Sequence, residues 1–167
     1  MSGHSKWSQI KHKKSLTDQK RGQLFSRTSK VITIAARKGT DPKTNTALAN
    51  AIEQARNINM PNDNIERAIK KVSEKDSAQL EEFVIEAIGP GEVALRIKGI
   101  TDNKNRTIAE VKKVLSNHEI KMVQPGNISW MFNSPIQIEE QTRQKIDKLV
   151  KALDNLDDVS HITSNLE

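Results

Sequence analysis

The hydrophobic pattern of this 167-residue chain changes its period near residue 78, from the spacing of helices to the alternation of strands. Before that point, apolar residues recur every three or four positions over 20–38, 46–58 and 63–72, which predicts three helices. After it, apolar residues alternate with others on both sides of a Gly-Pro-Gly turn at 89–91, which predicts a β-hairpin. A chain of this length with two periods is expected to form two small cores.

The two expected cores are separated by the polar stretch 73–79, which is the best linker candidate. We therefore expect a basic flexible arm over residues 1–16, a three-helix domain over 17–78 and a ferredoxin-like α+β domain over 79–167. The fold class predicted for the whole chain is α+β.

The last domain is expected to be a ferredoxin-like sandwich because strand, helix, strand, strand, helix and strand follow one another from residue 92 onward. The 83–88 strand is expected to join the same sheet. Either Asn105 or Thr107 is the expected N-cap of the first of these helices. The elements expected after residue 92 cover about 93–97, 105–115, 119–123, 128–132, 138–154 and 158–163.

Positive charge is concentrated at one end of the chain. Residues 1–38 hold ten basic side chains and one acidic one, whereas residues 79–167 hold 11 basic and 14 acidic side chains. On the first predicted helix, about 100° per residue places the basic side chains opposite the apolar stripe. These side chains are Lys20, Arg27, Lys30, Arg37 and Lys38. A positive surface of this kind predicts contact with phosphate groups.

Composition excludes several classes of protein. The chain has no cysteine, which excludes disulfides and thiolate zinc sites. No apolar run reaches the roughly 18 residues that span a bilayer, and the N-terminus lacks the apolar stretch of a signal peptide. The basic N-terminus also differs from a transit peptide, because it contains Trp7 and is rich in lysine rather than arginine. We expect a soluble, cytoplasmic protein without a membrane partner.

The titratable residues form no recognisable catalytic pattern. His4 and His12 have basic neighbours that disfavour a bound cation, and His118 and His161 are expected to be structural histidines. The acidic residues near the C-terminus are expected to lie on a solvated helix surface; they are Glu139, Glu140, Asp154, Asp157 and Asp158. We therefore expect no enzyme activity, no metal, no cofactor and no small-molecule substrate.

Several segments of the chain resemble the YebC/PmpR family and stand in that family's order between Gly3 and Val159. They are GHSKWSQIKHKK, DQKRGQLFSR, NMPNDNIERAIKK, IGPGEVAL, TDNKNRTIAEVK and ALDNLDDV. The resemblance implies a cytoplasmic DNA-binding transcriptional regulator. It also implies links to translation, because mitochondrial relatives act as translational activators and bacterial members are linked to stalled ribosomes. Many members carry a further domain inserted within the second one. Here Phe132-Asn133-Ser134-Pro135 leads almost directly to the closing helix, so the chain resembles a short form without that domain.

Three functions from different classes remain open on these residues. The interpretation we prefer is a translation factor that binds the ribosome through rRNA or tRNA, because a basic arm with an aromatic residue can enter an RNA-lined channel. The alternative is a DNA-binding transcriptional regulator. Its weakness is that the third helix offers only cations suited to phosphate rather than to base edges, namely Arg67, Lys70, Lys71 and Lys75. The third possible function is that of a protein-interaction module, in which the acidic second domain docks a partner. In each case we expect a monomer.

The expected nucleic-acid contact surface is the arm together with the first helix. Basic side chains neutralise phosphates, Trp7 stacks on an unpaired base, and Gly3 and His4 lie close to the ligand. The predicted contact residues are Gly3, His4, Ser5, Lys6, Trp7, Lys11, His12, Lys13, Lys14, Lys20, Arg21, Arg27 and Lys30. The competing interpretation is that Trp7 and Ile10 pack the arm onto the helices and that the lysines are only a solvated surface.

Overall fold

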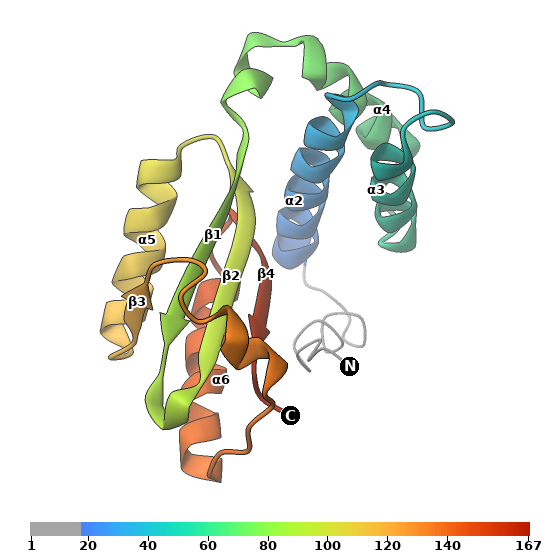
Figure 1. Ribbon diagram of the computed structural model, residues 1–167. Coiled ribbons are helices and arrows are strands. Elements are labelled where there is room, and N and C mark those ends of the chain that lie inside the picture. Colours follow the sequence, from blue (N-terminus) through green and yellow to red (C-terminus); the bar gives the residue numbers. More distant parts are fainter. Residues whose placement is uncertain (1–17) are drawn as a thin grey trace. The chain divides into compact units, whose positions relative to one another are not determined.

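The structure of the protein is a computed structural model that describes residues 18–167, and the chain divides into two compact units. The helical unit ends at Glu81 and also includes the short segment Ile100–Asn103. The sandwich unit contains Glu82–Gly99 and Lys104–Glu167. Figure 1 shows the helices and strands of both units.

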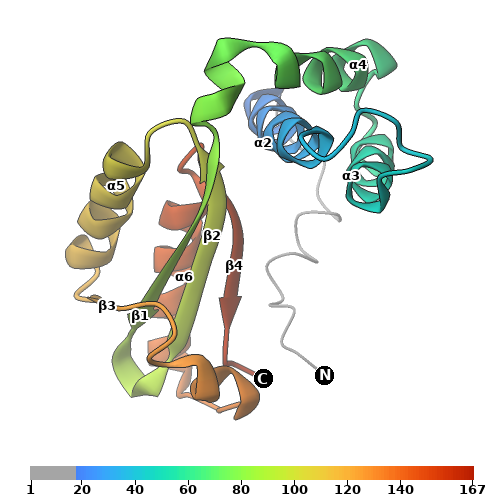
Figure 2. The same cartoon turned by 45° about the horizontal axis from the view of Figure 1, so that its top comes forward.

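The helical unit consists of three α-helices followed by two 3-10 turns. They are α2 (Asp18–Ala36), α3 (Thr46–Asn57), α4 (Asn62–Lys70), η1 (Lys71–Ser73) and η2 (Lys75–Gln79). Helix α2 packs against both α3 and α4, as Figure 2 shows. The buried core comes from the apolar stripes of the three helices. It contains Ile32, Ala36, Leu48, Ala51, Ile52, Ala55, Met60, Ile65 and Ala68.

Asn45 joins the end of α2 to the start of α3. Its side-chain oxygen accepts a hydrogen bond from Leu48 N at 3.1 Å, which caps α3. Its side-chain nitrogen donates to the carbonyl oxygens of Ala35 and Gly39, both at 2.8 Å. Because Asn45 is only 7% exposed, one buried amide satisfies three backbone groups at this corner.

The stretch predicted as a linker is folded onto the helical unit instead. The buried Ser77 hydroxyl lies within hydrogen-bond distance of the carbonyl oxygens of Val72, at 3.0 Å, and Glu74, at 2.8 Å, either of which can accept its proton. The Arg37 guanidinium donates to the carbonyl oxygens of Ser77 and, at 2.7 Å, of Leu80. The polar residues of this stretch therefore satisfy backbone groups of the 3-10 turns, which a composition-based linker prediction does not consider.

The sandwich unit is built on a four-stranded antiparallel sheet in the order β3-β1-β2-β4. The strands are β1 (Glu81–Ile88), β2 (Ala94–Thr101), β3 (Lys121–Val123) and β4 (Val159–Ser164), and the turn η3 (Pro90–Glu92) joins β1 to β2. Helices α5 (Lys104–Asn117) and α6 (Glu140–Asp154) cover one face of the sheet (Figure 1). The predicted α+β fold class is confirmed.

The strand predicted over 128–132 is wrong, because this segment forms the 3-10 helix η4 (Ser129–Asn133). Strand β1 already pairs beside β2, in the inner place that a third strand of a ferredoxin-like sheet would take. Ile128 and Met131 are buried together against Ala94, on the sheet face opposite α6. Ile128, Trp130 and Phe132 alternate as in a strand, whereas Ile128 and Met131, three positions apart, share one side of a helical turn.

The predicted N-caps of α5 are also wrong. The helix begins at Lys104, so both Asn105 and Thr107 lie inside it. Thr107 is buried, and its hydroxyl donates to Asp158 Oδ2 at 2.8 Å. The threonine therefore ties α5 to the segment before β4 instead of capping the helix.

Candidate nucleic-acid interface

Most of the predicted contact residues belong to the part of the chain before Asp18. Gly3, His4, Ser5, Lys6, Trp7, Lys11, His12, Lys13 and Lys14 lie outside the described residues. The four others, Lys20, Arg21, Arg27 and Lys30, lie on α2. The candidate interface described below is therefore built on α2 and the elements packed against it.

The α2 cations differ in exposure. Lys20 and Arg21 are exposed, and the Arg21 guanidinium lies 3.8 Å from the Asp18 carboxylate in a solvent-exposed pair. Lys30 is half-buried. Arg27 is only 8% exposed, so its predicted place on the outer surface of the helix is wrong. Arg27 lies four residues before Val31, beside the apolar stripe, where a long aliphatic stem is readily buried.

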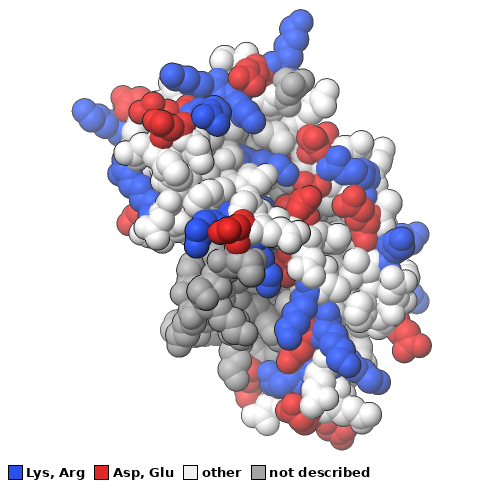
Figure 3. All heavy atoms as spheres, turned by 180° about the vertical axis from the view of Figure 1, so that it is seen from behind, with Lys and Arg blue, Asp and Glu red and all other residues white. Residues whose placement is uncertain are grey.

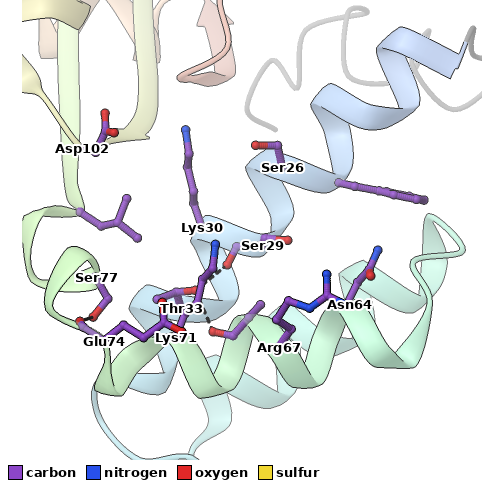
Figure 4. Close-up of a pocket in the computed structure, with 13 residues that line it drawn as sticks. Ser26, Ser29, Lys30, Thr33, Asn64, Arg67, Lys71, Glu74, Ser77 and Asp102 are labelled. Carbon is purple, nitrogen blue, oxygen red and sulfur yellow. Dashed lines mark hydrogen bonds between the residues drawn. The ribbon is translucent and has the colours of Figure 1, made fainter.

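A cavity of about 470 Å³ opens between α2 and α4 (Figure 4). Figure 4 shows Lys30 on the α2 side and Asn64 and Arg67 on the α4 side. The cavity is lined by Phe25, Ser26, Ser29, Lys30, Thr33, Asn64, Arg67, Ala68, Lys71, Glu74, Ser77, Leu80 and Asp102. Among the four predicted residues on α2, the cavity lining includes only Lys30.

Helical spacing explains why these residues share one cavity. On α2, Ser26, Ser29 and Thr33 follow each other at intervals of three and four. On the other side, Asn64 and Arg67 are three residues apart on α4, and Lys71 follows one turn later in η1. Each helix therefore presents one polar stripe to the cavity and its apolar stripe to the core.

Thr33 fastens the two sides of the cavity to each other. Its hydroxyl is within hydrogen-bond distance of the Ala68 carbonyl oxygen, at 2.8 Å, and of the Ser29 carbonyl oxygen, at 3.0 Å. Thr33 is 1% exposed, so this cross-link is shielded from solvent. The distance between α2 and α4 is thus fixed by a buried contact as well as by the apolar core.

Other polar groups at the cavity have no such structural task. Within residues 18–167, the side chains of Ser26, Ser29 and Asn64 make no hydrogen bond to another residue, and those of Arg67 and Lys71 make no ion pair. Hydroxyl, amide and guanidinium groups left without protein partners next to a cavity can bind a ligand.

The charge of the lining favours an anion. It contains the cations Lys30, Arg67 and Lys71 and the carboxylates Glu74 and Asp102. Figure 3 shows basic and acidic side chains interspersed over the visible face of the molecule, so that face carries no broad field of one sign. A local group of cations with hydroxyl and amide donors matches a phosphodiester better than it matches an uncharged ligand.

The acidic residues near the C-terminus do not all lie on a solvated surface as predicted. Asp158 is 4% exposed and accepts hydrogen bonds from Thr107 Oγ1 and, at 2.9 Å, from the Arg106 guanidinium. This carboxylate is structural. Among residues 18–167, no three histidine, cysteine, aspartate or glutamate side chains come together in a way that suits a metal ion. In the same range, no helix is both long enough and apolar enough to cross a membrane.

The contact residues predicted from the sequence include only Lys30 of the cavity lining, and they omit both its uncharged polar residues and the cations Arg67 and Lys71. Asn64 lies inside the helix predicted over 63–72, but it carries no charge. Ser26 and Ser29 carry no charge, so a count of cations does not register them. The signal that was present is their helical register with Lys30 and Thr33.

Two domain families match most of the chain. Residues 5–75 match the family described as the TACO1/YebC protein N-terminal domain. Residues 80–139 match the family described as the TACO1/YebC second and third domain. The resemblance carried by the sequence motifs is thereby confirmed.

Similar proteins from bacteria share one name. A protein of Halothermothrix orenii is 53% identical over 134 residues, which cover 79% of this chain and 53% of that protein. A protein of Pseudothermotoga lettingae is 41% identical over 177 residues, covering 99% of this chain and 70% of that protein. Both are named "Probable transcriptional regulatory protein", which describes regulation rather than an enzyme activity. The chain spans about half the length of the first of these relatives.

A solved structure shares the fold described above. The crystal structure of a conserved hypothetical protein from Aquifex aeolicus superimposes with a TM-score of 0.86 at 32% sequence identity. The match covers 98% of this chain and 97% of that chain. Domain families, similar sequences and fold agree, and the chain belongs to the TACO1/YebC family.

Proposed function

We propose that this protein is a non-enzymatic, nucleic-acid-binding regulator of gene expression that holds a phosphodiester backbone in the cavity between α2 and α4. The observation that carries the proposal is the lining of that cavity, in which Lys30, Arg67 and Lys71 stand beside hydroxyl and amide groups. Phosphate contacts of this kind supply most of the affinity and position the protein on its ligand.

The level of regulation that we propose is transcription, with DNA as the ligand. The names of the relatives support this choice.

A second candidate is the translation factor that the sequence favours, bound to rRNA or tRNA on the ribosome. The basic arm with Trp7 supports it, since single-stranded or looped RNA is recognised by aromatic stacking and cationic contacts. In either role we propose a cytoplasmic monomer that takes no small-molecule substrate.

Charge reversal at the cavity tests the contact surface. We compare the double variant Arg67→Glu and Lys71→Glu with the matched control Lys112→Glu and Lys113→Glu, which changes two exposed cations on α5. Affinity for labelled duplex DNA and structured RNA is measured by fluorescence anisotropy over a range of salt. We expect the cavity variant to lose at least about tenfold in affinity and about two units of salt slope, and the control to lose neither.

Mapping of bound nucleic acid in cells separates the two levels of regulation. If discrete promoter DNA crosslinks to the wild-type protein but not to the cavity variant, the result supports a role in transcription. Enrichment of rRNA or tRNA with co-sedimentation on ribosomes supports translation instead. Equal affinity of the cavity variant and the wild type would contradict the proposed contact surface.

A further inference from the structure

We propose that the cavity between α2 and α4 receives one unpaired nucleotide of the bound strand, an inference that rests on the proposed function. Its volume of about 470 Å³ lies within the range of about 300–1,000 Å³ that ligand sites span. What distinguishes it from a general phosphate surface is the combination of an aromatic ring, an amide and cations within one lining.

Phe25 supplies the ring. It lines the cavity and also packs against the core of the helical unit, so the ring is held in place by α2 and its apolar neighbours. An aromatic side chain at a phosphate-binding surface stacks on a base whatever the identity of that base. The ring therefore packs on the core and also offers the cavity a stacking surface, which cations and hydroxyl groups do not provide.

Asn64 and the two serines supply hydrogen-bonding groups for the base edge and the sugar. Within residues 18–167, the side chains of Asn64, Ser26 and Ser29 make no hydrogen bond to protein groups. Asn64 is half-buried. A half-buried amide with free donor and acceptor atoms matches a base edge, which presents donors and acceptors side by side.

The cations complete the site. Lys30 lies on the α2 side, and Arg67 and Lys71 lie on α4 and the turn that follows it. A single nucleotide in a strand has one phosphate on each side of its sugar. Cations on both sides of the cavity therefore suit a nucleotide that is still part of a strand.

Duplex nucleic acid does not meet these conditions. In a duplex each base is stacked on both faces and paired along one edge, so a concave site reaches only sugar and phosphate. A bulged or single-stranded base is already exposed, and placing it against Phe25 requires little further unstacking. The cavity should therefore distinguish unpaired from paired positions.

The test uses the full chain and four ligands in DNA and in RNA form. They are a fully paired duplex, the same duplex with one bulged 2-aminopurine, the same duplex with an abasic bulge, and free adenosine monophosphate as competitor. Binding is measured by anisotropy, and stacking by the fluorescence of the 2-aminopurine. The variants are Phe25→Leu, Asn64→Ala and Arg67→Glu, each checked for folding by circular dichroism.

The wild type is expected to bind the bulged duplex about tenfold more tightly than the paired or abasic one, with a change in 2-aminopurine fluorescence. Phe25→Leu and Asn64→Ala should remove this preference and keep the binding of the paired duplex. Asn64→Ala alters a side chain outside the core. Its preference for the bulged duplex therefore tests the inference even if Phe25→Leu is poorly folded.

Three results would overturn the inference. Equal affinity of the wild type for the three duplexes would show a phosphate surface alone, and the proposed function would survive. Displacement of the bulged duplex by adenosine monophosphate, at concentrations comparable to the duplex, would assign the cavity to a free nucleotide. If the wild type binds none of the nucleic acids, the proposed function fails together with the inference.

Discussion

Arg96 in the sandwich unit and Arg67 in the helical unit are cations used in opposite ways. In the sandwich unit, Arg96 Nε donates to Glu86 Oε1 at 2.7 Å, and the Glu86 side chain is only 2% exposed. In the helical unit, Arg67 and Lys71 line a cavity and form no ion pair within residues 18–167. The same residue types therefore hold the fold together in one unit and can bind a ligand in the other.

The difference lies in what each cation contacts, and sequence composition does not reveal it. Glu86 also accepts a hydrogen bond from Gly126 N at 2.8 Å, and the Arg96 guanidinium lies 4.1 Å from the centroid of the Phe132 ring. Each member of this network is held by another, which fixes the guanidinium in place. A phosphate-binding surface needs the contrary, namely cations whose partners come from the ligand.

The largest effect is expected where the sandwich unit is packed most closely, at Gly99 on β2. A Cβ atom there would lie 2.8 Å from Phe83 Cε1 and would overlap the carbonyl oxygen of Asp158. We expect Gly99→Ala to lower the free energy of unfolding by about 4 kcal/mol or more, because backbone must shift. Urea unfolding followed by circular dichroism measures this. A loss below about 1 kcal/mol would contradict the close packing of β2 on the segment before β4.

The next effect tests the paired cation. Arg96→Ala leaves the buried Glu86 carboxylate without its charged partner, so we expect stability to fall by about 3 kcal/mol. Glu110→Ala is the control, because its pair with Arg106 is 3.8 Å long and both side chains are more than 40% exposed. We expect the control to lose less than about 1 kcal/mol. Similar losses for both variants would remove the distinction between buried and exposed pairs.

In the helical unit, the equivalent buried polar group is the Asn45 amide. Asn45→Ala removes the cap of α3 and leaves the carbonyl oxygens of Ala35 and Gly39 without their donor. We expect a loss of about 2 kcal/mol, measured by thermal and urea unfolding. Asn45→Asp keeps the capping acceptor and removes the donor, so its loss should be intermediate if both halves of the amide matter.

The unpaired cation should behave differently from the paired one. We expect Arg67→Ala to change the free energy of unfolding by no more than about 0.5 kcal/mol. The Arg67 side chain is exposed and makes no hydrogen bond or ion pair within residues 18–167. Its affinity for nucleic acid should fall by about 1 kcal/mol, a factor near five. Arg96→Ala should leave that affinity unchanged at temperatures where it is folded. If Arg67→Ala lowered stability and Arg96→Ala lowered affinity instead, Arg67 would be the structural cation and Arg96 the ligand-binding one.

Much of the fold follows from the period of the apolar residues. The three helices of the helical unit and the β1–β2 hairpin are where the pattern predicts them, since each buries one stripe or one face. The segment 128–132 was misassigned because its apolar residues fit a strand and a helical turn equally well. The pairing of β1 with both β2 and β3 shows why 128–132 cannot be a strand between them, and the sequence pattern does not reveal this pairing.

The site was harder to predict, because charge alone does not show which cations line a cavity and which are buried. Lys30 was predicted and lines the cavity, whereas Arg27 has the same sign and the same helix but is buried. Asn64 is part of the candidate site because α4 faces α2 across the cavity, which the sequence does not show. The arm predictions, from Gly3 to Lys14, stay predictions because they lie outside the described residues.

The smallest effect compares one substitution at two glycines. Gly22 lies inside α2 and is exposed, and a Cβ atom there meets nothing within 4 Å. Gly22→Ala should raise the free energy of unfolding by about 0.5–1 kcal/mol, because alanine loses less backbone entropy in a helix. The same change at Gly99 should have the opposite sign, since contact rather than entropy decides it there. Urea unfolding of both variants measures the two effects side by side. If Gly22→Ala lowers the free energy of unfolding, a Cβ atom at Gly22 meets other atoms of the chain. The contrast between the open position at Gly22 and the closely packed one at Gly99 would then be lost.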